Sequence, residues 1–253
     1  MMDWLAPVMD RYDRRARLRP ALFCGLPLVA SLFLLIPQFG VIWGSLGGIM
    51  VYCGGSILLI QISRDLGKAL EVRLYRSWGG KPSMAMLRHC DTRLEKLNRD
   101  RYRSFLCRSV PDLTLASPQE EEENPEEADA KYESANRWLL EQTRERPQFS
   151  LLSTENMNYG FRRNLLGLKP TALGIDAVAL VIVIGVAATS WTGQFASTIQ
   201  GLSPEWWASA AITVGHVLLF ALYVRANWVR TAAEKYAVQL LAACDTLDGA
   251  MDP

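Results

Sequence analysis

The sequence has few of the residues on which most catalytic and metal sites are built. It contains two histidines and five scattered cysteines, and no cysteine forms a C-x-x-C or Cys/His motif. This spacing predicts neither a disulfide framework nor a zinc site, so we expect reduced cysteines that mostly pack against other side chains. G-x-S-x-G, P-loop and H-E-x-x-H motifs are also missing. We therefore expect no enzyme, no metal and no cofactor.

Charge is missing from long parts of the chain. No Asp, Glu, Lys or Arg occurs between Pro20 and Ser63, although the chain has 27 basic and 26 acidic residues. A helix needs about 20 apolar residues to cross a bilayer, so this run is long enough for two spans. The turn formers Pro37 and Gly40 separate them. A cleaved signal peptide is the alternative for the first span, but no clear cleavage site interrupts the apolar run.

Hydropathy predicts an all-α membrane protein with four spans in two hairpins. The predicted spans are Ala21–Ile36, Val41–Ile62, Thr171–Trp191 and Trp206–Val224. Basic residues flank each hairpin on both sides, whereas the two loops inside the hairpins contain none. By the positive-inside rule, both termini and the segment between the hairpins are expected in the cytoplasm.

Four regions follow from this topology. They are a basic flank with the first hairpin (1–63), a helical cytoplasmic segment with an acidic linker (64–169), the second hairpin (170–224) and a cytoplasmic C-terminal helix (225–253). In the second region, helices are predicted over Ser63–Trp78, from Ser83 to Val110 as one helix or a pair, over Ala128–Thr143, and from Ser153 or Thr154 to Leu166. The acidic run Glu120–Glu123 is interpreted as a linker or as the start of a helix.

The C-terminal helix is expected to continue from the fourth span without a break as far as Gly249. Apolar residues alternate along it at spacings of four and three, which resembles a short coiled-coil seam. The residues of the seam are Val229, Ala233, Tyr236, Leu240, Ala243 and Leu247. They can pack against the chain's own cytoplasmic segment or against other copies of the chain.

Polar residues line one side of the second span. At about 100° per residue, Ser45, Tyr52, Ser56 and Ser63 fall within about 20° of one line. A polar stripe of this kind can line a water-filled path, and hydroxyl hydrogen bonds between packed helices are the alternative. These four residues are our pore-lining candidates.

Two ionisable residues lie inside the second hairpin. Asp176 is near the start of the third span and His216 is near the middle of the fourth. Ionisable groups at such depth are costly unless they face protein or water, so each is a candidate for gating or proton sensing. Measured from their own ends of the hairpin, they lie at different depths. We therefore expect no direct pair between them within one subunit.

Basic residues cluster in the middle segment. Lys96, Arg99, Arg101 and Arg103 are interleaved with Tyr102 and Phe105. This pattern suits single-stranded nucleic acid, salt bridges with the acidic run, or anionic lipid headgroups. Arg162 and Arg163, just before the third span, are further anion-binding candidates at the membrane surface.

Several short stretches of the middle segment and of the start of the second hairpin are distinctive together. They are Trp78-Gly79-Gly80-Lys81-Pro82, Leu87-Arg88-His89, Arg101-Tyr102, Asn136-Arg137-Trp138-Leu139-Leu140-Glu141, Glu155-Asn156 and Tyr159-Gly160-Phe161-Arg162-Arg163-Asn164. These stretches resemble a family of small bacterial membrane proteins, and with it the membrane effectors of Hailong-type antiphage defence. The resemblance implies a homo-oligomeric channel, such as a tetramer. It also implies a nucleotidyltransferase partner whose single-stranded DNA oligomer controls the channel.

The leading hypothesis is therefore an oligomeric effector that forms a ligand-controlled ion channel in the inner membrane. The alternative is a membrane-anchored module that recruits a soluble partner. A secondary transporter is disfavoured because the sequence shows no inverted repeat.

Overall fold

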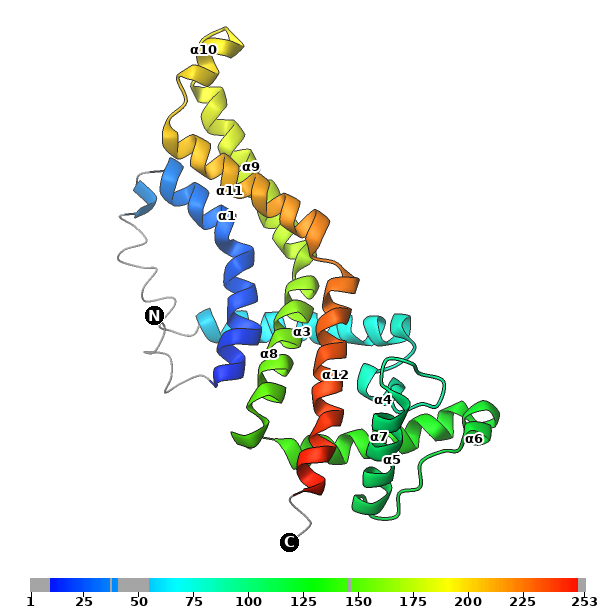
Figure 1. Cartoon of the computed structure of the whole chain (residues 1–253). Coiled ribbons are helices and arrows are strands. Elements are labelled where there is room, and N and C mark those ends of the chain that lie inside the picture. Colours follow the sequence, from blue (N-terminus) through cyan, green and yellow to red (C-terminus); the bar gives the residue numbers. More distant parts are fainter. Residues whose placement is uncertain (1–9, 37, 41–54, 145–146, 250–253) are drawn as a thin grey trace. The chain divides into compact units, whose positions relative to one another are not determined.

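The computed structural model describes residues 10–36, 38–40, 55–144 and 147–249, and within these ranges it contains helices and no strands (Figure 1). The predicted all-α fold class is confirmed. The chain divides into two compact units. We call Met1–Leu70 with Gly160–Val229 the span unit, and Glu71–Tyr159 with Arg230–Pro253 the charged unit.

Three helical segments of the span unit are long and apolar enough to cross a membrane. They are Asp13–Leu35, Lys169–Thr189 and Pro204–Tyr223, and the last two agree with the predicted third and fourth spans to within two residues. The first begins earlier than predicted because the basic flank is itself helical. Most of the predicted second span, Val41–Ile62, lies outside the described residues. The finding is therefore a membrane protein with three candidate spans.

The span unit is built around three packed helices. The first segment comprises η2 (Asp13–Leu18) and α1 (Arg19–Leu35), and α1 packs against both α9 (Lys169–Thr189) and α11 (Pro204–Leu218), which also pack against each other (Figure 1). The indole N–H of Trp206 at the start of α11 donates to the Val183 carbonyl at 2.8 Å. The short helix α10 (Phe195–Gln200) lies in the loop between α9 and α11. Outward-facing apolar side chains such as Val181 and Ile184 of α9 are exposed, as expected for a surface that contacts lipid or other helices.

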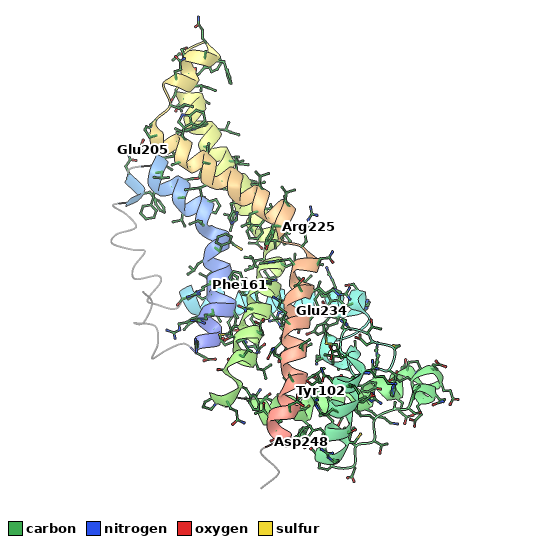
Figure 2. All side chains as sticks on the ribbon, in the orientation of Figure 1. Tyr102, Phe161, Glu205, Arg225, Glu234 and Asp248 are labelled. Carbon is green, nitrogen blue, oxygen red and sulfur yellow. The ribbon has the colours of Figure 1, made fainter. Side chains whose placement is uncertain are left out.

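The predicted continuous helix from the fourth span to Gly249 is wrong, because two separate helices meet at Val224. The π-helix η5 (Leu219–Tyr223) ends α11, and α12 (Ala226–Asp248) starts after a break that Figure 2 marks at Arg225. The Val224 N–H donates to the Leu219 carbonyl at 3.1 Å, and the Val224 carbonyl accepts a hydrogen bond from the Lys169 ammonium at 3.0 Å. This tertiary contact occupies the carbonyl that a continuous helix would use, and no local Pro or Gly signals the break.

Two glycines allow a close crossing of α3 (Ser56–Trp78) and α8 (Ser150–Gly167) within the span unit. A Cβ atom on Gly167 would lie 2.8 Å from the Leu66 carbonyl carbon and oxygen, which are backbone atoms. A Cβ atom on Gly67 would collide with Asn164, which is fully buried and donates to the Ala16 carbonyl at 2.7 Å. The two helices therefore touch at the level of their backbones.

The charged unit has its own hydrophobic core. Its helices are the end of α3, α4 (Pro82–Ala85), α5 (Lys96–Ser109), α6 (Pro118–Glu123), α7 (Pro125–Thr143), the start of α8, and most of α12, with a 3-10 turn, η4 (Pro147–Phe149), before α8. Phe105, Leu106, Tyr132, Leu139, Leu240 and Leu241 are among its fully buried side chains. The seam residues Leu240, Ala243 and Leu247 belong to this core. In this part of α12 the seam packs against the chain's own charged unit.

Helix ends in the charged unit follow local signals in several places. The helix α3 ends at Trp78 as predicted, where Gly79 and Gly80 adopt positive φ and the Gly80 N–H returns to the Tyr75 carbonyl at 2.8 Å. The acidic run is helix α6, the second of the two interpretations, because Ser117 and Glu120 form a capping box. In this box the Ser117 backbone N–H donates to the Glu120 carboxylate at 2.6 Å. This hydrogen bond and the Ser117 side chain lower the pKa of Glu120.

The segment after Gly80 differs from its prediction. Ser83 does not cap a long helix; it is the second residue of the one-turn helix α4, and its hydroxyl donates to the buried Asn136 amide oxygen at 2.6 Å. Leu97, an apolar residue of the stretch predicted as helical, is 81% exposed. Turns link α4 to α5, so the stretch predicted as one helix or a pair is a pair, and α4 is only four residues long.

Of the described cysteines, Cys24 and Cys244 are buried and Cys90 and Cys107 are exposed, with no disulfide. Burial raises the pKa of Cys244 to about 12.

We predict that Gly167→Ala destabilises the protein, because the new methyl group meets backbone atoms that cannot rotate away. The expected cost is about 1–3 kcal/mol, typical of overpacking. Thermal unfolding of the full-length protein in detergent measures it. Gly174→Ala, also in a helix but with nothing within 4 Å of a Cβ atom, is the matched control and should lose no stability. Equal stability of the two variants would contradict the close crossing.

Candidate functional site

A hydrogen-bonded Asp–His pair lies inside the membrane-spanning helices. His216 Nδ1 is 2.8 Å from Asp176 Oδ1, and the side chains are 3% and 1% exposed respectively. The expectation of no direct pair is therefore wrong. Asp176 follows the first residue of α9 by seven positions and His216 precedes the last residue of η5 by seven. In two antiparallel helices these positions lie at the same level. The span boundaries predicted from the sequence differ from these helix ends, and they therefore placed the two residues at different depths.

The first span also contacts this pair. His216 Nε2 is 3.2 Å from the Phe23 carbonyl oxygen of α1, so the imidazole bridges α9 and α1. The rings of Phe23 and Phe220 lie against the imidazole, with centroids 5.2 and 4.6 Å away. The second carboxylate oxygen, Asp176 Oδ2, is buried and has no hydrogen-bond partner. The site is thus enclosed by aromatic rings and carries one unsatisfied acceptor.

The polar face of α11 continues beyond His216. Thr213 and Ser209, one and two turns earlier, are fully buried, and the hydroxyls of Ser209 and Ser31 are 2.9 Å apart. The Thr213 hydroxyl donates to the Ser209 carbonyl at 2.9 Å. We did not select Ser31, Ser209 or Thr213 from the sequence. The spacing of 209, 213 and 216, which puts these residues on one helix face, is the signal that could have identified two of them.

The pore-lining candidates of the second span are only partly described. Ser45 and Tyr52 lie outside the described residues. Ser56 and Ser63 are buried in the span unit, at the start of α3, and the Ser63 hydroxyl has no hydrogen-bond partner.

The basic cluster of α5 separates into buried and exposed members. Arg99 is 7% exposed and donates to the Asp91 carbonyl. Arg103 donates to the carbonyls of Leu87 and Ala116, each at 2.5 Å, and to the Tyr132 hydroxyl at 2.9 Å. These two guanidinium groups tie the core of the charged unit together.

The Arg103 contacts extend into the acidic run. The Tyr132 hydroxyl donates to the Glu121 carboxylate, which also accepts the His89 backbone N–H at 3.0 Å. Burial and this carboxylate raise the pKa of Tyr132 to about 12. The Arg103 guanidinium is 3.8 Å from the Glu121 carboxylate. For this arginine, the structure therefore shows the predicted alternative of a salt bridge with the acidic run.

Arg101 and Arg108 pair with α12 at the surface of the charged unit. Their guanidinium groups lie 2.7 Å from Asp245 and 2.9 Å from Asp248, and all four side chains are more than 40% exposed. The Asp245 carboxylate raises the pKa of Arg101. Lys96 is exposed at the first position of α5. Exposed pairs of this kind contribute little to stability, so an anionic ligand can compete for these arginines.

The candidates before the third span have structural partners in the span unit. Arg162 donates to the Trp228 carbonyl at 2.9 Å and lies over the Trp228 ring, 4.9 Å from its centroid. Arg163 is 4% exposed and donates to the Asn164 amide oxygen at 3.1 and 3.2 Å.

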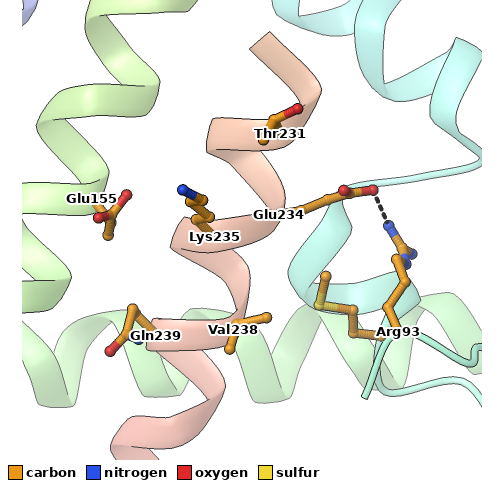
Figure 3. A pocket seen from close by; sticks show the side chains of 8 residues that line it. Arg93, Glu155, Thr231, Glu234, Lys235, Val238 and Gln239 are labelled. Atoms are coloured by element: carbon orange, nitrogen blue, oxygen red, sulfur yellow. Dashed lines mark hydrogen bonds and ion pairs between the residues drawn. The ribbon is translucent and has the colours of Figure 1, made fainter. Parts of the chain in front are cut away.

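Grooves lie in the described part of the charged unit. The first, about 440 Å³ in volume, is lined by residues of both charges, including Arg93, Glu155, Glu234 and Lys235 (Figure 3). Arg93 and Glu234 form an ion pair at 3.1 Å. The second, about 480 Å³, lies beside Arg88, Cys90 and Glu121. Within the described part of the chain, no group of three His, Cys, Asp or Glu residues is arranged to hold a metal ion.

No protein family, curated protein or solved structure matches the chain.

We predict that Arg103→Lys destabilises the protein by about 2–4 kcal/mol, because a lysine cannot satisfy two carbonyls and a hydroxyl in fixed directions. Thermal or denaturant unfolding of the purified protein measures the change. Arg108→Lys, on the same helix but in an exposed ion pair, is the control and should unfold like the wild type. A result in which Arg103→Lys is as stable as Arg108→Lys would show that the buried network is not formed.

Proposed function

We propose that the chain is an oligomeric effector of the bacterial inner membrane that forms a ligand-controlled ion channel. The buried contact between Asp176 and His216 is the observation that supports this function most. A helix that only anchors a protein needs no ionisable group, and such groups are costly within a membrane. Here a carboxylate, an imidazole and a backbone carbonyl connect three candidate spans. Helices joined through a few polar contacts can shift between alternative packings, as a gate requires.

Conduction is assigned to an assembly of several copies. In the described part of one chain, α1, α9 and α11 pack together, and the buried polar residues of these helices are Ser31, Asp176, Ser209, Thr213 and His216. Apolar side chains on the outer faces, such as Val178 and Leu222, remain exposed. These faces are available for lipid and for helices of neighbouring copies. A homo-oligomer such as a tetramer could enclose a path lined by the second span, where Ser45 and Tyr52 lie.

Control by an anionic ligand is assigned to the charged unit. The exposed ion pairs of Arg101 with Asp245 and of Arg108 with Asp248 join α5 to the end of α12. Phosphate groups could replace these aspartates, since the pairs are solvent-accessible and weak. The neighbouring Tyr102 is largely buried, so the guanidinium groups and not base stacking would provide the contact. The family resemblance suggests the ligand: a single-stranded DNA oligomer made by a nucleotidyltransferase that acts in antiphage defence.

A membrane-anchored module that recruits a soluble partner is the second candidate. The observation in its favour is that the charged unit has a closed hydrophobic core of its own. Such a unit can present a binding surface without any conduction by the spans.

We predict that the protein reconstituted in vesicles of phosphatidylethanolamine and phosphatidylglycerol passes potassium, and that a single-stranded DNA oligomer changes this flux. The double variant Arg101→Ala/Arg108→Ala should lose the response to the oligomer, because its phosphate contacts are gone, and keep the basal flux. Arg137→Ala, in the charged unit on α7, is the control and should respond like the wild type.

The same measurement separates the two candidates. Leucine at Ser45 and at Tyr52 should abolish flux in a channel and leave partner binding intact. An absence of flux with and without the oligomer, together with a monomer in mild detergent, would reject the channel and favour the anchored module.

A further inference from the structure

The surroundings of the His216 ring restrict where its protons can be. A backbone carbonyl oxygen accepts hydrogen bonds and cannot donate them. The ring nitrogen 3.2 Å from the Phe23 carbonyl must therefore carry a hydrogen for this contact to be attractive. The other ring nitrogen faces Asp176 at 2.8 Å, where a hydrogen must lie between the two atoms. That hydrogen belongs to the imidazole or to the carboxyl group.

Two arrangements satisfy both contacts. In the first, His216 is an imidazolium that donates to an ionised Asp176 and to the Phe23 carbonyl. In the second, a protonated Asp176 donates to a neutral His216, which donates to Phe23. Each arrangement has zero net charge and holds one proton more than an ionised Asp beside a neutral His.

We propose that Asp176, His216 and the Phe23 carbonyl form a buried proton-binding site, and that its bound proton holds α1 and α9 to α11. Without that proton a neutral imidazole has a single N–H. It can then donate to Asp176 or to Phe23. At the other contact, the lone pair of the ring nitrogen faces a lone pair of the acceptor oxygen, which is repulsive. Loss of the proton therefore releases one of the two neighbouring helices. The site does not depend on conduction by the protein.

Burial strengthens the hold on the proton. The two side chains are 3% and 1% exposed, and the Asp176 Oδ2 atom has no partner. Removing the proton would leave a net negative charge that nothing in the described contacts offsets. An uncompensated charge inside a protein or membrane is strongly unfavourable. The buried surroundings therefore favour the two arrangements that carry no net charge.

Other titratable groups on the packed elements do not neutralise the pair. On α1, Cys24 is buried beside Phe23, and Arg19, the first residue of the helix and one turn before Phe23, is exposed. At the start of α9, the Lys169 ammonium donates to the Val224 carbonyl at 3.0 Å. Tyr223, at the end of η5, is exposed, and Glu205 lies at the opposite end of α11. None of these described groups is a hydrogen-bond partner of the Asp176 carboxylate.

The direct test is magic-angle-spinning NMR of the full-length protein with ¹⁵N-labelled histidine in lipid vesicles near neutral pH. The chain has two histidines, and the spectrum of His216→Gln identifies His89 by difference. We expect His216 with both nitrogens protonated, or with one protonated nitrogen and an infrared band of a carboxylic acid that Asp176→Asn removes. A neutral His216 beside an ionised Asp176 would overturn the proposal.

Stability against pH gives a second, independent readout. The folded protein binds one proton more than the unfolded chain at mildly alkaline pH, so thermal stability should fall by several degrees from about pH 7 to about pH 10. Asp176→Asn should fold and remove this component, because the amide N–H can donate to a neutral His216 that still donates to Phe23. Ser209→Ala, which breaks the hydroxyl contact with Ser31 in the same helices, should be less stable and keep the wild-type pH profile. A pH profile of Asp176→Asn that matches the wild type would overturn the proposal.

Discussion

Hydrogen bonding between helices inside an apolar environment is the constraint on which the span unit depends. Lipid chains are as apolar as leucine, so burial of apolar surface does little to hold membrane helices together. Polar contacts and close backbone approaches must supply specificity. In this chain His216 reaches both Asp176 and the Phe23 carbonyl, and Ser209 reaches Ser31. These contacts fix how α1, α9 and α11 are aligned along their axes.

In the charged unit, arginine side chains supply the buried hydrogen bonds. Its arginines satisfy backbone carbonyls that turns leave unpaired, as Arg103 does at Leu87 and Ala116. The remaining arginines of α5 pair with aspartates of α12 at the surface, where water weakens the attraction. This division assigns stability to the buried guanidinium groups and leaves the exposed ones available to a ligand. The basic cluster of the sequence thus contains buried arginines that bind backbone carbonyls and exposed arginines that pair with aspartates.

Much of the fold could be predicted because it depends on local signals. Uncharged apolar runs identified three spans that the structure describes, and glycine after Trp78 marked the end of α3. The break at Val224 could not be predicted, since it arises from a hydrogen bond with Lys169, far away in the sequence. The position of Ser83 likewise depends on its hydrogen bond with Asn136, which is 53 residues away in the sequence. Local pattern carries no information on such contacts.

The candidate site was predicted in its members and not in its geometry. Asp176 and His216 stand out because ionisable residues are rare in spans. Their pairing depends on where α9 begins and η5 ends, and errors of two residues at the first boundary and one residue at the second were enough to hide it. The Phe23 carbonyl has no sequence signal at all, since every residue carries one. Ser45 and Tyr52 remain predictions.

The contact between Asp176 and His216 is tested most directly by a double-mutant cycle. The unfolding free energies of the wild type, Asp176→Ala, His216→Ala and the double variant are measured in the same detergent. A direct buried contact predicts strong coupling, with the double variant losing about 2 kcal/mol or more less than the sum of the single losses. Losses that add to within about 0.5 kcal/mol would show that the two residues do not interact.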